Sequence, residues 1–173
     1  MLRDKALLEL GGETLVERGL LKLREVCPEV AIAGGAPELG PFGRVIADTR
    51  PGCGPLAGIV AALEQSEFEW NLFLAVDMAF VPARALHALL SAAGGPELVV
   101  VAQAEGQVHP LCGVYSRGAL GALRTELEAG RLKVKDAIAA TGAYSNLPFD
   151  EEKWFRNLNT PEDFSEALGF ERE

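Results

Sequence analysis

Cysteine, clustered basic residues and long apolar runs are all scarce in this chain. The three cysteines, Cys27, Cys53 and Cys112, are too few and too widely spaced for a Cys-x-x-Cys metal site or a disulfide framework. No stretch reaches the roughly 18 to 20 apolar residues of a membrane span, and the first residues lead into no secretory signal. These absences predict a cytoplasmic protein with no membrane partner.

The charge balance argues against a nucleic-acid partner. Asp and Glu outnumber Lys and Arg by 25 to 16, which gives a net charge of −9. Binding a phosphate backbone calls for a clustered basic surface, whereas the basic residues here are scattered along the sequence. A small anionic substrate is compatible with this balance, because a local pocket can be positive on an acidic protein.

Length and composition are ordinary for one folded domain. The chain has 173 residues, of which 49% are apolar and 24% are charged. A chain of this length buries a core without disulfides or metals, so we expect a single domain over residues 1–173.

Segments with the apolar spacing of strands alternate with segments that have the spacing of helices. Thr14 and Glu17 fit a capping box ahead of a helix that ends at Cys27. Further helices are expected over residues 56–63, 83–92, 120–128 and 135–140, and strands over 30–33, 44–47, 72–76, 97–103 and 109–115. From Phe155 we expect a strand end and then a helix, with Thr160 as N-cap and Pro161 in first position. The alternation predicts a three-layer α/β fold with a mainly parallel sheet.

The most informative segment is Asp48-Thr-Arg-Pro-Gly-Cys-Gly-Pro-Leu-Ala-Gly58. Its glycines let backbone N–H groups approach an anion closely, and the positive end of the following helix favours negative charge there. The apolar run 72–76 then leads into Asp77, and ligands of open α/β sheets bind beyond the carboxyl ends of the strands. An acid that faces phosphates in that place would hold a magnesium ion. Together the segments predict a nucleotide site; the alternative is a plain turn with Asp77 as a helix cap.

Six short motifs also stand in a fixed order along the chain. They are Arg3-Asp-Lys-Ala-Leu-Leu, Gly12-Glu-Thr-Leu-Val-Glu-Arg, Pro51-Gly-Cys-Gly-Pro-Leu-Ala-Gly, Leu74-Ala-Val-Asp-Met-Ala-Phe-Val, His109-Pro-Leu and Asn157-Leu-Asn-Thr-Pro-Glu-Asp. This set resembles the molybdenum cofactor guanylyltransferases, which are nucleotidyltransferases with a Rossmann-like fold. The resemblance covers essentially the whole chain, although the glycine loop and the aspartate strand also resemble those of cytidylyltransferases.

The resemblance implies a reaction and its partners. GMP would pass from GTP to the terminal phosphate of molybdopterin, with pyrophosphate leaving and Mg²⁺ as cofactor. Other proteins of cofactor synthesis are implied as partners. Two alternatives stay open: a cytidylyltransferase that acts on molybdopterin or another small phosphate acceptor, and a non-catalytic nucleotide-binding or scaffold protein.

The resemblance also implies roles for individual residues. Lys5 would neutralise the triphosphate, Asp77 would bind magnesium and Asp48 would contact the nucleoside. The loop residues Gly52, Gly54, Pro55, Leu56 and Gly58 would shape the nucleotide pocket. Asn159 is a weaker candidate for the metal or pyrophosphate side, and His109 is as well explained by packing in a turn as by contact with substrate.

The chain departs from the resemblance at its front. Relatives begin with an apolar strand and a Leu-Ala-Gly-Gly-x-x-x-Arg-Met-Gly loop that cradles the triphosphate, before the Asp-Lys that stands here at Asp4 and Lys5. Met1 aligns with the methionine of that loop. We therefore expect the central strand of the sheet and the main phosphate cradle to be missing, and this form of the chain to be less stable and inactive.

Overall fold

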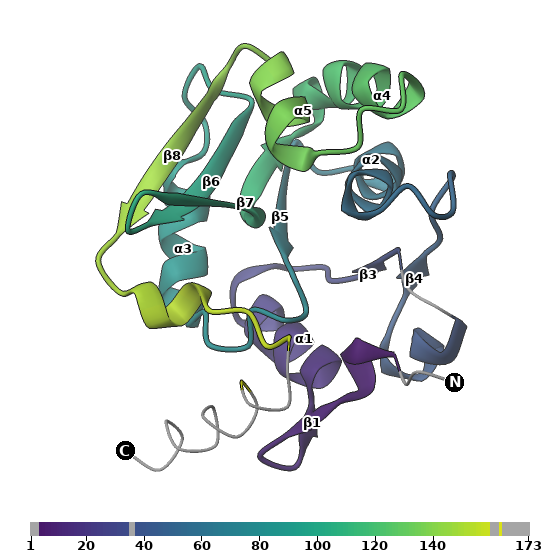
Figure 1. Ribbon diagram of the computed structural model, residues 1–173, viewed down its shortest axis with the longest axis vertical. Helices are drawn as coiled ribbons and strands as arrows, with labels where there is room; N and C mark the ends of the chain where they lie inside the picture. Colours follow the sequence, from purple (N-terminus) through teal and green to yellow (C-terminus); the bar gives the residue numbers. More distant parts are fainter. Residues whose placement is uncertain (1–3, 35–36, 160–162, 164–173) are drawn as a thin grey trace.

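The computed structural model describes residues 4–34, 37–159 and 163, and Figure 1 shows helices on both sides of a central sheet. The helices are α1 (Leu15–Val26), α2 (Pro55–Gln65), α3 (Ala83–Ala92), α4 (Leu120–Glu128) and α5 (Val134–Ala140). The strands are β1 (Glu9–Leu10), β2 (Glu13–Thr14), β3 (Ile32–Ala33), β4 (Val45–Ile46), β5 (Trp70–Leu74), β6 (Val99–Ala104), β7 (Gln107–Ser116) and β8 (Tyr144–Phe149). Short 3-10 turns η1 (Lys5–Leu7), η2 (Pro37–Phe42), η3 (Arg117–Ala119) and η4 (Glu152–Phe155) join them.

The main sheet has the order β5-β7-β6-β8. β7 runs antiparallel to β5 and to β6, and β8 runs parallel to β6, so three of these four strands share one direction. β7 is reversed because Glu105 and Gly106, with φ of 46° and 78°, turn the chain back directly after β6. The expected α/β fold is confirmed, with β7 as the antiparallel member of the sheet.

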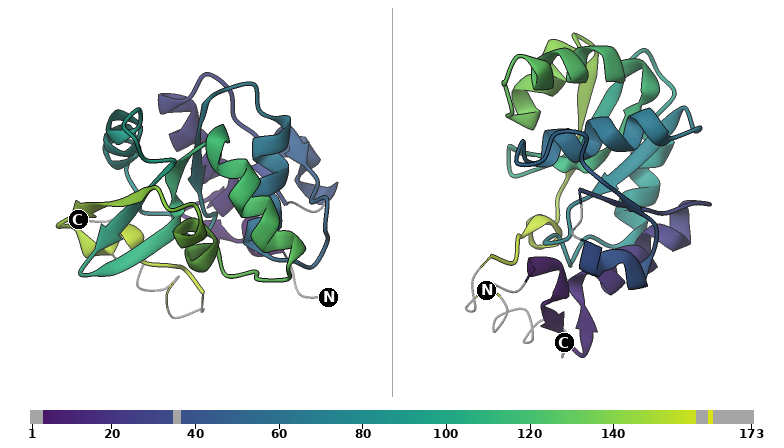
Figure 2. Two further views of the ribbon diagram at one scale, coloured as in Figure 1. Left: turned by 90° about the horizontal axis from the view of Figure 1, so that it is seen from above. Right: turned by 90° about the vertical axis from the view of Figure 1, so that its right-hand side faces the viewer.

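The core lies in two layers, one on each face of the main sheet. Successive side chains of β6 point to opposite faces, so Val99 and Val101 pack with α2, α4 and α5, whereas Val100 and Ala102 pack with α3. All four side chains are buried. Figure 2 shows α3 on one side of the sheet and α2 and α4 on the other, which is the three-layer arrangement expected from the alternating pattern.

Some elements differ from the sequence-based expectations. The strand expected over 72–76 ends at Leu74, because the chain turns after it and Met78 N–H donates to the Ala75 carbonyl at 3.0 Å. The strand end expected from Phe155 is wrong, since that residue closes the 3-10 turn η4. β8 and the β1–β2 hairpin were not expected. β8 carries few apolar residues because alternate side chains along it are exposed. The expected cap Thr160 and first-turn Pro161 lie outside the described residues.

The sheet is interrupted between β3 and β5. Within the described part of the chain, β3 pairs with β4 alone, as a separate two-stranded parallel sheet, and β5 pairs with β7 alone. Over the same residues, no helix combines the length and the apolar character that crossing a membrane requires.

Candidate active site

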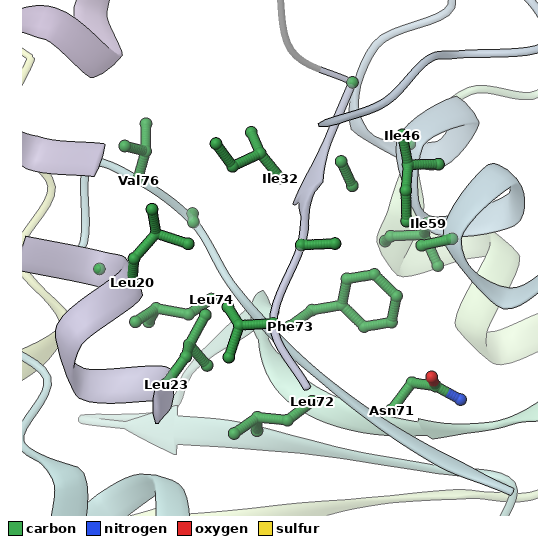
Figure 3. A pocket seen from close by; sticks show the side chains of 18 of the residues that line it. Leu20, Leu23, Ile32, Ile46, Ile59, Asn71, Leu72, Phe73, Leu74 and Val76 are labelled. Carbon is green, nitrogen blue, oxygen red and sulfur yellow. The ribbon is translucent and has the colours of Figure 1, made fainter. Parts of the chain in front are cut away.

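A cavity of about 1320 Å³ occupies the interruption between β3 and β5. Most of its wall is apolar, and Figure 3 shows Leu20, Ile32, Leu72 and Leu74 among the side chains around it. At the carboxyl ends of the strands it is lined by Gly34 after β3 and by two acids, Asp48 after β4 and Asp77 after β5, and at the opposite end by other polar residues, among them Arg44, Gln65 and Asn71. We call the end of the cavity at Asp48 and Asp77 the polar mouth. It holds the place that ligands take in open α/β sheets.

Three of the predicted site residues meet at the polar mouth. The Lys5 ammonium donates to Asp77 Oδ2 at 2.8 Å and to Asn159 Oδ1 at 2.6 Å. Lys5 stands at the start of η1, Asp77 in the turn after β5, and Asn159 more than 80 residues further on. Leu158 N–H donates to the Asp77 carbonyl at 3.0 Å, which holds the last segment against that turn. The structure thus joins three residues that are distant in sequence.

The two oxygen atoms that Lys5 contacts are also suitable ligands for a divalent cation. An ammonium group now lies between two oxygen atoms, a carboxylate oxygen of Asp77 and an amide oxygen of Asn159. Mg²⁺ prefers oxygen ligands and is commonly held by one or two carboxylates, with substrate phosphates and water completing its shell. No cluster of three His, Cys, Asp or Glu residues that could hold a metal occurs among the described residues. A cation at this mouth would therefore depend on ligands from the substrate.

Asp48 follows β4, and its side chain is half-buried. Its Oδ1 is buried and has no hydrogen-bond partner among the described residues, and burial raises the pKa of its carboxyl group above the ordinary value. A Cβ atom on Gly34 would lie 2.9 Å from this oxygen, and one on Gly58 would lie 3.4 Å from it. Two glycines therefore leave room for the carboxylate. A buried acceptor without a donor favours a ligand that brings an N–H or O–H group.

The glycine loop leads into α2, and no side chain caps the first turn of this helix. Gly52 and Gly54 have φ of 81° and 68°, values that L-residues rarely adopt. Gly54 is the N-cap residue and offers no side-chain hydrogen bond, and Pro55 takes the first turn of α2. Pro55 has no N–H group and Ala57 N–H donates to the Gly54 carbonyl at 3.1 Å, so Leu56 N–H is the donor that this helix start would offer to an anion. The Leu56 side chain points elsewhere: it is completely buried in the core shared by α2 and α4.

His109 lies apart from the other candidates. Its ring is stacked on Phe155 at a centroid distance of 4.9 Å, it is buried, and it does not line the cavity. Burial lowers the pKa of its imidazole below the ordinary value. Packing therefore accounts for its position, but the expected turn is wrong, since His109 lies within β7 and pairs with Ala102 of β6.

One residue near the mouth was given no role from the sequence. Asp163 accepts a hydrogen bond from Asn159 N–H at 2.8 Å and so fixes the backbone of that residue. The signal was present in the quoted motif, because an acid four positions after an asparagine in a Thr-Pro-Glu-Asp context is typical of a cap contact.

Comparison with known proteins adds to this geometry. The sequence profile described as the MobA-like NTP transferase domain matches residues 1–143. A protein from Pelotomaculum thermopropionicum, named probable molybdenum cofactor guanylyltransferase, is 36% identical over 173 residues, which cover 95% of this chain and 84% of that protein.

Two solved structures resemble the fold. Molybdopterin-guanine dinucleotide biosynthesis protein A from Archaeoglobus fulgidus superposes with a TM-score of 0.79 and 24% identity over 98% of this chain and 91% of its own. The 2-C-methyl-D-erythritol 4-phosphate cytidylyltransferase from Thermus thermophilus superposes with a TM-score of 0.74 and 21% identity over 98% of this chain and 94% of its own. At these identities the two structures support the fold alone.

Proposed function

Because the chain belongs to the MobA-like NTP transferase family, we propose that it transfers GMP from GTP to molybdopterin, with release of pyrophosphate. The observation that carries this proposal is the meeting of Lys5 and Asn159 at Asp77, which lines the same cavity as Gly52 and Gly54 of the glycine loop. Lys5 would offer a cation to a triphosphate, Asp77 and Asn159 would offer oxygen ligands to a metal, and the start of α2 would offer the positive end of its dipole. The name of the Pelotomaculum relative supports the choice of GTP and of a molybdopterin acceptor.

The proposed chemistry needs positioning and charge neutralisation. A phosphate oxygen of the acceptor attacks the α-phosphorus of GTP, and the bond from that phosphorus to the pyrophosphate oxygen breaks. The Lys5 ammonium, which lies 2.8 Å from Asp77 Oδ2, would neutralise charge on the phosphates. Fixed groups that face developing charge lower the barrier without any covalent step by the protein.

Magnesium is the cofactor proposed for this mouth. Asp77 would hold the ion, with the Asn159 amide oxygen within reach, and the ion would supply charge neutralisation at the phosphates. Lys5 would then give up its contacts to these two oxygens and turn to the triphosphate.

Asp48 is proposed to contact the nucleoside. Its buried Oδ1 lacks a donor, and the space beside it is kept open by Gly34 and Gly58. An N–H group of the base or a ribose hydroxyl would satisfy that oxygen. GTP and CTP both carry such groups, so the cytidylyltransferase alternative differs only in the base that is accepted.

The first test is turnover and binding with the two nucleotides. Pyrophosphate release would be measured with molybdopterin, Mg²⁺ and either GTP or CTP, and binding of each nucleotide by calorimetry. We expect GTP to be preferred. Preference for CTP would favour the cytidylyltransferase. Binding without turnover would agree with a non-catalytic nucleotide-binding protein and with the expectation that this form of the enzyme is inactive. The other cofactor-synthesis partners and the cytoplasmic location stay predictions.

Replacing Asp77 tests the metal role. Asp77→Asn keeps the shape of the side chain and removes its charge, so we expect turnover to fall on the order of 100-fold or more while the fold survives. Asp150→Asn is the matched control, because Asp150 is exposed and does not line the cavity. Unchanged Mg²⁺ dependence in Asp77→Asn would remove Asp77 from the metal site.

Replacing Lys5 tests the phosphate contact. Lys5→Met preserves most of the side-chain length but not the ammonium, so GTP affinity is expected to fall about tenfold or more, with a weaker dependence on salt. Equal GTP affinity of Lys5→Met and the parent chain, measured by calorimetry at two salt concentrations, would contradict the role.

A further inference from the structure

The segment that brings Asn159 to the polar mouth is anchored by two buried side chains. Phe155 belongs to the core layer that packs with α3, and Leu158 is completely buried three residues later. Leu158 N–H also donates to the Asp77 carbonyl at 3.0 Å. The position of Asn159 at the mouth therefore depends on how residues 155–158 are docked against the rest of the fold.

The Phe155 ring is held by two rings of the main sheet. The His109 imidazole of β7 stacks on it, with ring centroids 4.9 Å apart and 21° between the ring planes. The Phe149 ring of β8 lies at a centroid distance of 5.2 Å and an angle of 45°. The imidazole forms no hydrogen bond or ion pair within the part of the chain that the structure describes. Stacking on Phe155 is thus the specific contact that this ring makes.

A bulge in β7 decides which face of the sheet His109 occupies. Val101 of β6 pairs with Gly113, but the next residue of β6, Ala102, pairs with His109. The three residues of β7 between His109 and Gly113 therefore have no partner on β6. Such an irregularity shifts the alternation of side chains along a strand.

The shift brings His109 to the face on which Phe155 lies. Cys112 belongs to the core layer of α3, and Leu111, the residue before it, packs against the opposite layer. In a regular strand His109 would lie on the same face as Leu111, since the two are separated by two positions. The bulge inserts an odd number of residues, so His109 lies opposite Ala102 and stacks on Phe155 in the layer of α3.

Two further features fix the bulge. The hydroxyl group of Tyr115, a completely buried residue of β7, donates to the Pro110 carbonyl at 2.5 Å. A Cβ atom on Gly113 would lie 2.6 Å from the Val100 carbonyl oxygen, so this approach of β7 to β6 requires glycine. Bulges beside binding sites re-aim individual side chains, and the side chain re-aimed here is that of His109.

We infer that His109 is a positioning residue of the proposed site: it holds Phe155 in place from the β7 bulge, and through Phe155 it keeps Asn159 beside Lys5 and Asp77. His109 does not line the cavity, so its effect on a ligand passes through residues 155–159. The inference rests on the proposed function for the ligand, whereas the docking of the segment is measured without any ligand.

The test compares three variants of the full chain. His109→Ala removes the ring. Because burial lowers the pKa of the imidazole, the ring is neutral at pH 7, and His109→Phe preserves a neutral stacking face. Leu89→Ala is the matched control, because Leu89 is a completely buried residue of α3 in the same core layer and does not line the cavity.

The first readout is amide exchange at Leu158, relative to exchange at Val100 in the middle of β6. We expect His109→Ala to raise this ratio about tenfold, because the segment then opens locally, and His109→Phe to restore the parent ratio. Leu89→Ala lowers the stability of the whole fold and should leave the ratio unchanged. The side-chain amide signal of Asn159 in NMR spectra should shift in His109→Ala alone.

Tyr115→Phe tests the bulge without changing the stacked rings. It removes the donor to the Pro110 carbonyl, so we expect the exchange ratio at Leu158 to rise about fivefold. An unchanged ratio in both His109→Ala and Tyr115→Phe would overturn the inference. So would an equal rise in Leu89→Ala, which would mean that lost packing alone frees the segment.

The second readout is the affinity for GTP with Mg²⁺, measured by calorimetry. We expect His109→Ala to bind about tenfold more weakly than the parent chain, and His109→Phe and Leu89→Ala to bind as the parent does. Faster exchange at Leu158 with unchanged affinity would overturn the role at the site. Absence of GTP binding by the parent chain would contradict the proposed function, while the exchange ratios and the Asn159 signal would still decide whether His109 positions the segment.

Discussion

The position of Asp48 lowers the stability of the fold but favours the binding of a ligand. Its Oδ1 is buried without a partner, which costs stability when the group is charged, and the same oxygen is well placed for a ligand. Burial raises the pKa of the carboxyl group, so the folded state binds its proton more tightly than the unfolded state does. The contribution of Asp48 to stability is therefore lost as pH rises from its ordinary pKa through the raised one.

Asp48→Asn separates these properties. The amide carries no charge, so we expect a higher Tm than that of the parent chain at pH 7, and a difference that shrinks at pH values near the ordinary carboxyl pKa, where Asp48 is protonated. GTP binding is expected to weaken about tenfold. Thermal melts across pH and calorimetry with GTP measure the two effects. A lower Tm at pH 7 would mean that the carboxylate has a partner in solution.

Gly34 offers a test of the space that Asp48 needs. Gly34 and Gly142 both have φ of 68°, so alanine at either position is expected to cost about 1 kcal/mol of unfolding free energy. An added Cβ meets Asp48 only at Gly34, since nothing lies within 4 Å of one at Gly142. We expect similar losses in urea denaturation but weaker GTP binding only for Gly34→Ala. Equal GTP affinity in the two variants would show that Asp48 need not keep its position.

At the scale of elements, the helices follow from local sequence signals. Thr14 accepts from Glu17 N–H, and the Glu17 carboxylate accepts from Thr14 N–H at 2.9 Å, so the predicted capping box is confirmed. α3 and α4 have the bounds that their apolar spacing predicted. These elements are predictable because capping and periodicity act within one or two turns of chain.

Removing the cap of α1 is expected to destabilise the fold. Thr14→Ala should cost about 1 kcal/mol in urea denaturation, since Glu17 N–H in the first turn of α1 loses its acceptor. Thr125→Ala is the matched control: Thr125 is exposed in α4 and its hydroxyl donates to the Gly121 carbonyl, a contact that adds little to a helix. A cost as large for Thr125→Ala would contradict the capping explanation.

The strands depend on partners, and their limits were harder to predict. β5 stops at Leu74 although Ala75 and Val76 continue the apolar run, because the chain turns to present Asp77 beside Lys5. β8 was missed because an edge strand with alternate residues exposed lacks the apolar run by which β6 was found. Pairing across the sheet decides both, and no short window of sequence contains it.

At the scale of the whole molecule, side chains pack more closely in the core around α2 and α4 than around the cavity between β3 and β5. Leu123→Ala removes a completely buried side chain and should cost about 2–5 kcal/mol. Leu72→Ala removes a side chain that already lines a cavity, so about 1 kcal/mol is expected. Urea denaturation measures the free energy of unfolding of both variants. Equal losses would show that the cavity is filled in solution.

The sequence by itself determined the helices and the α/β class and predicted a nucleotide site, because caps, apolar spacing, glycine loops and an acid after an apolar run are local properties. Only the tertiary structure decided that Lys5, Asp77 and Asn159 share one polar mouth, that Leu56 and His109 lie away from it, and that Asp48 is held between two glycines. Such meetings depend on strand order and on which helix covers which face. These are set by packing between residues that are far apart along the chain.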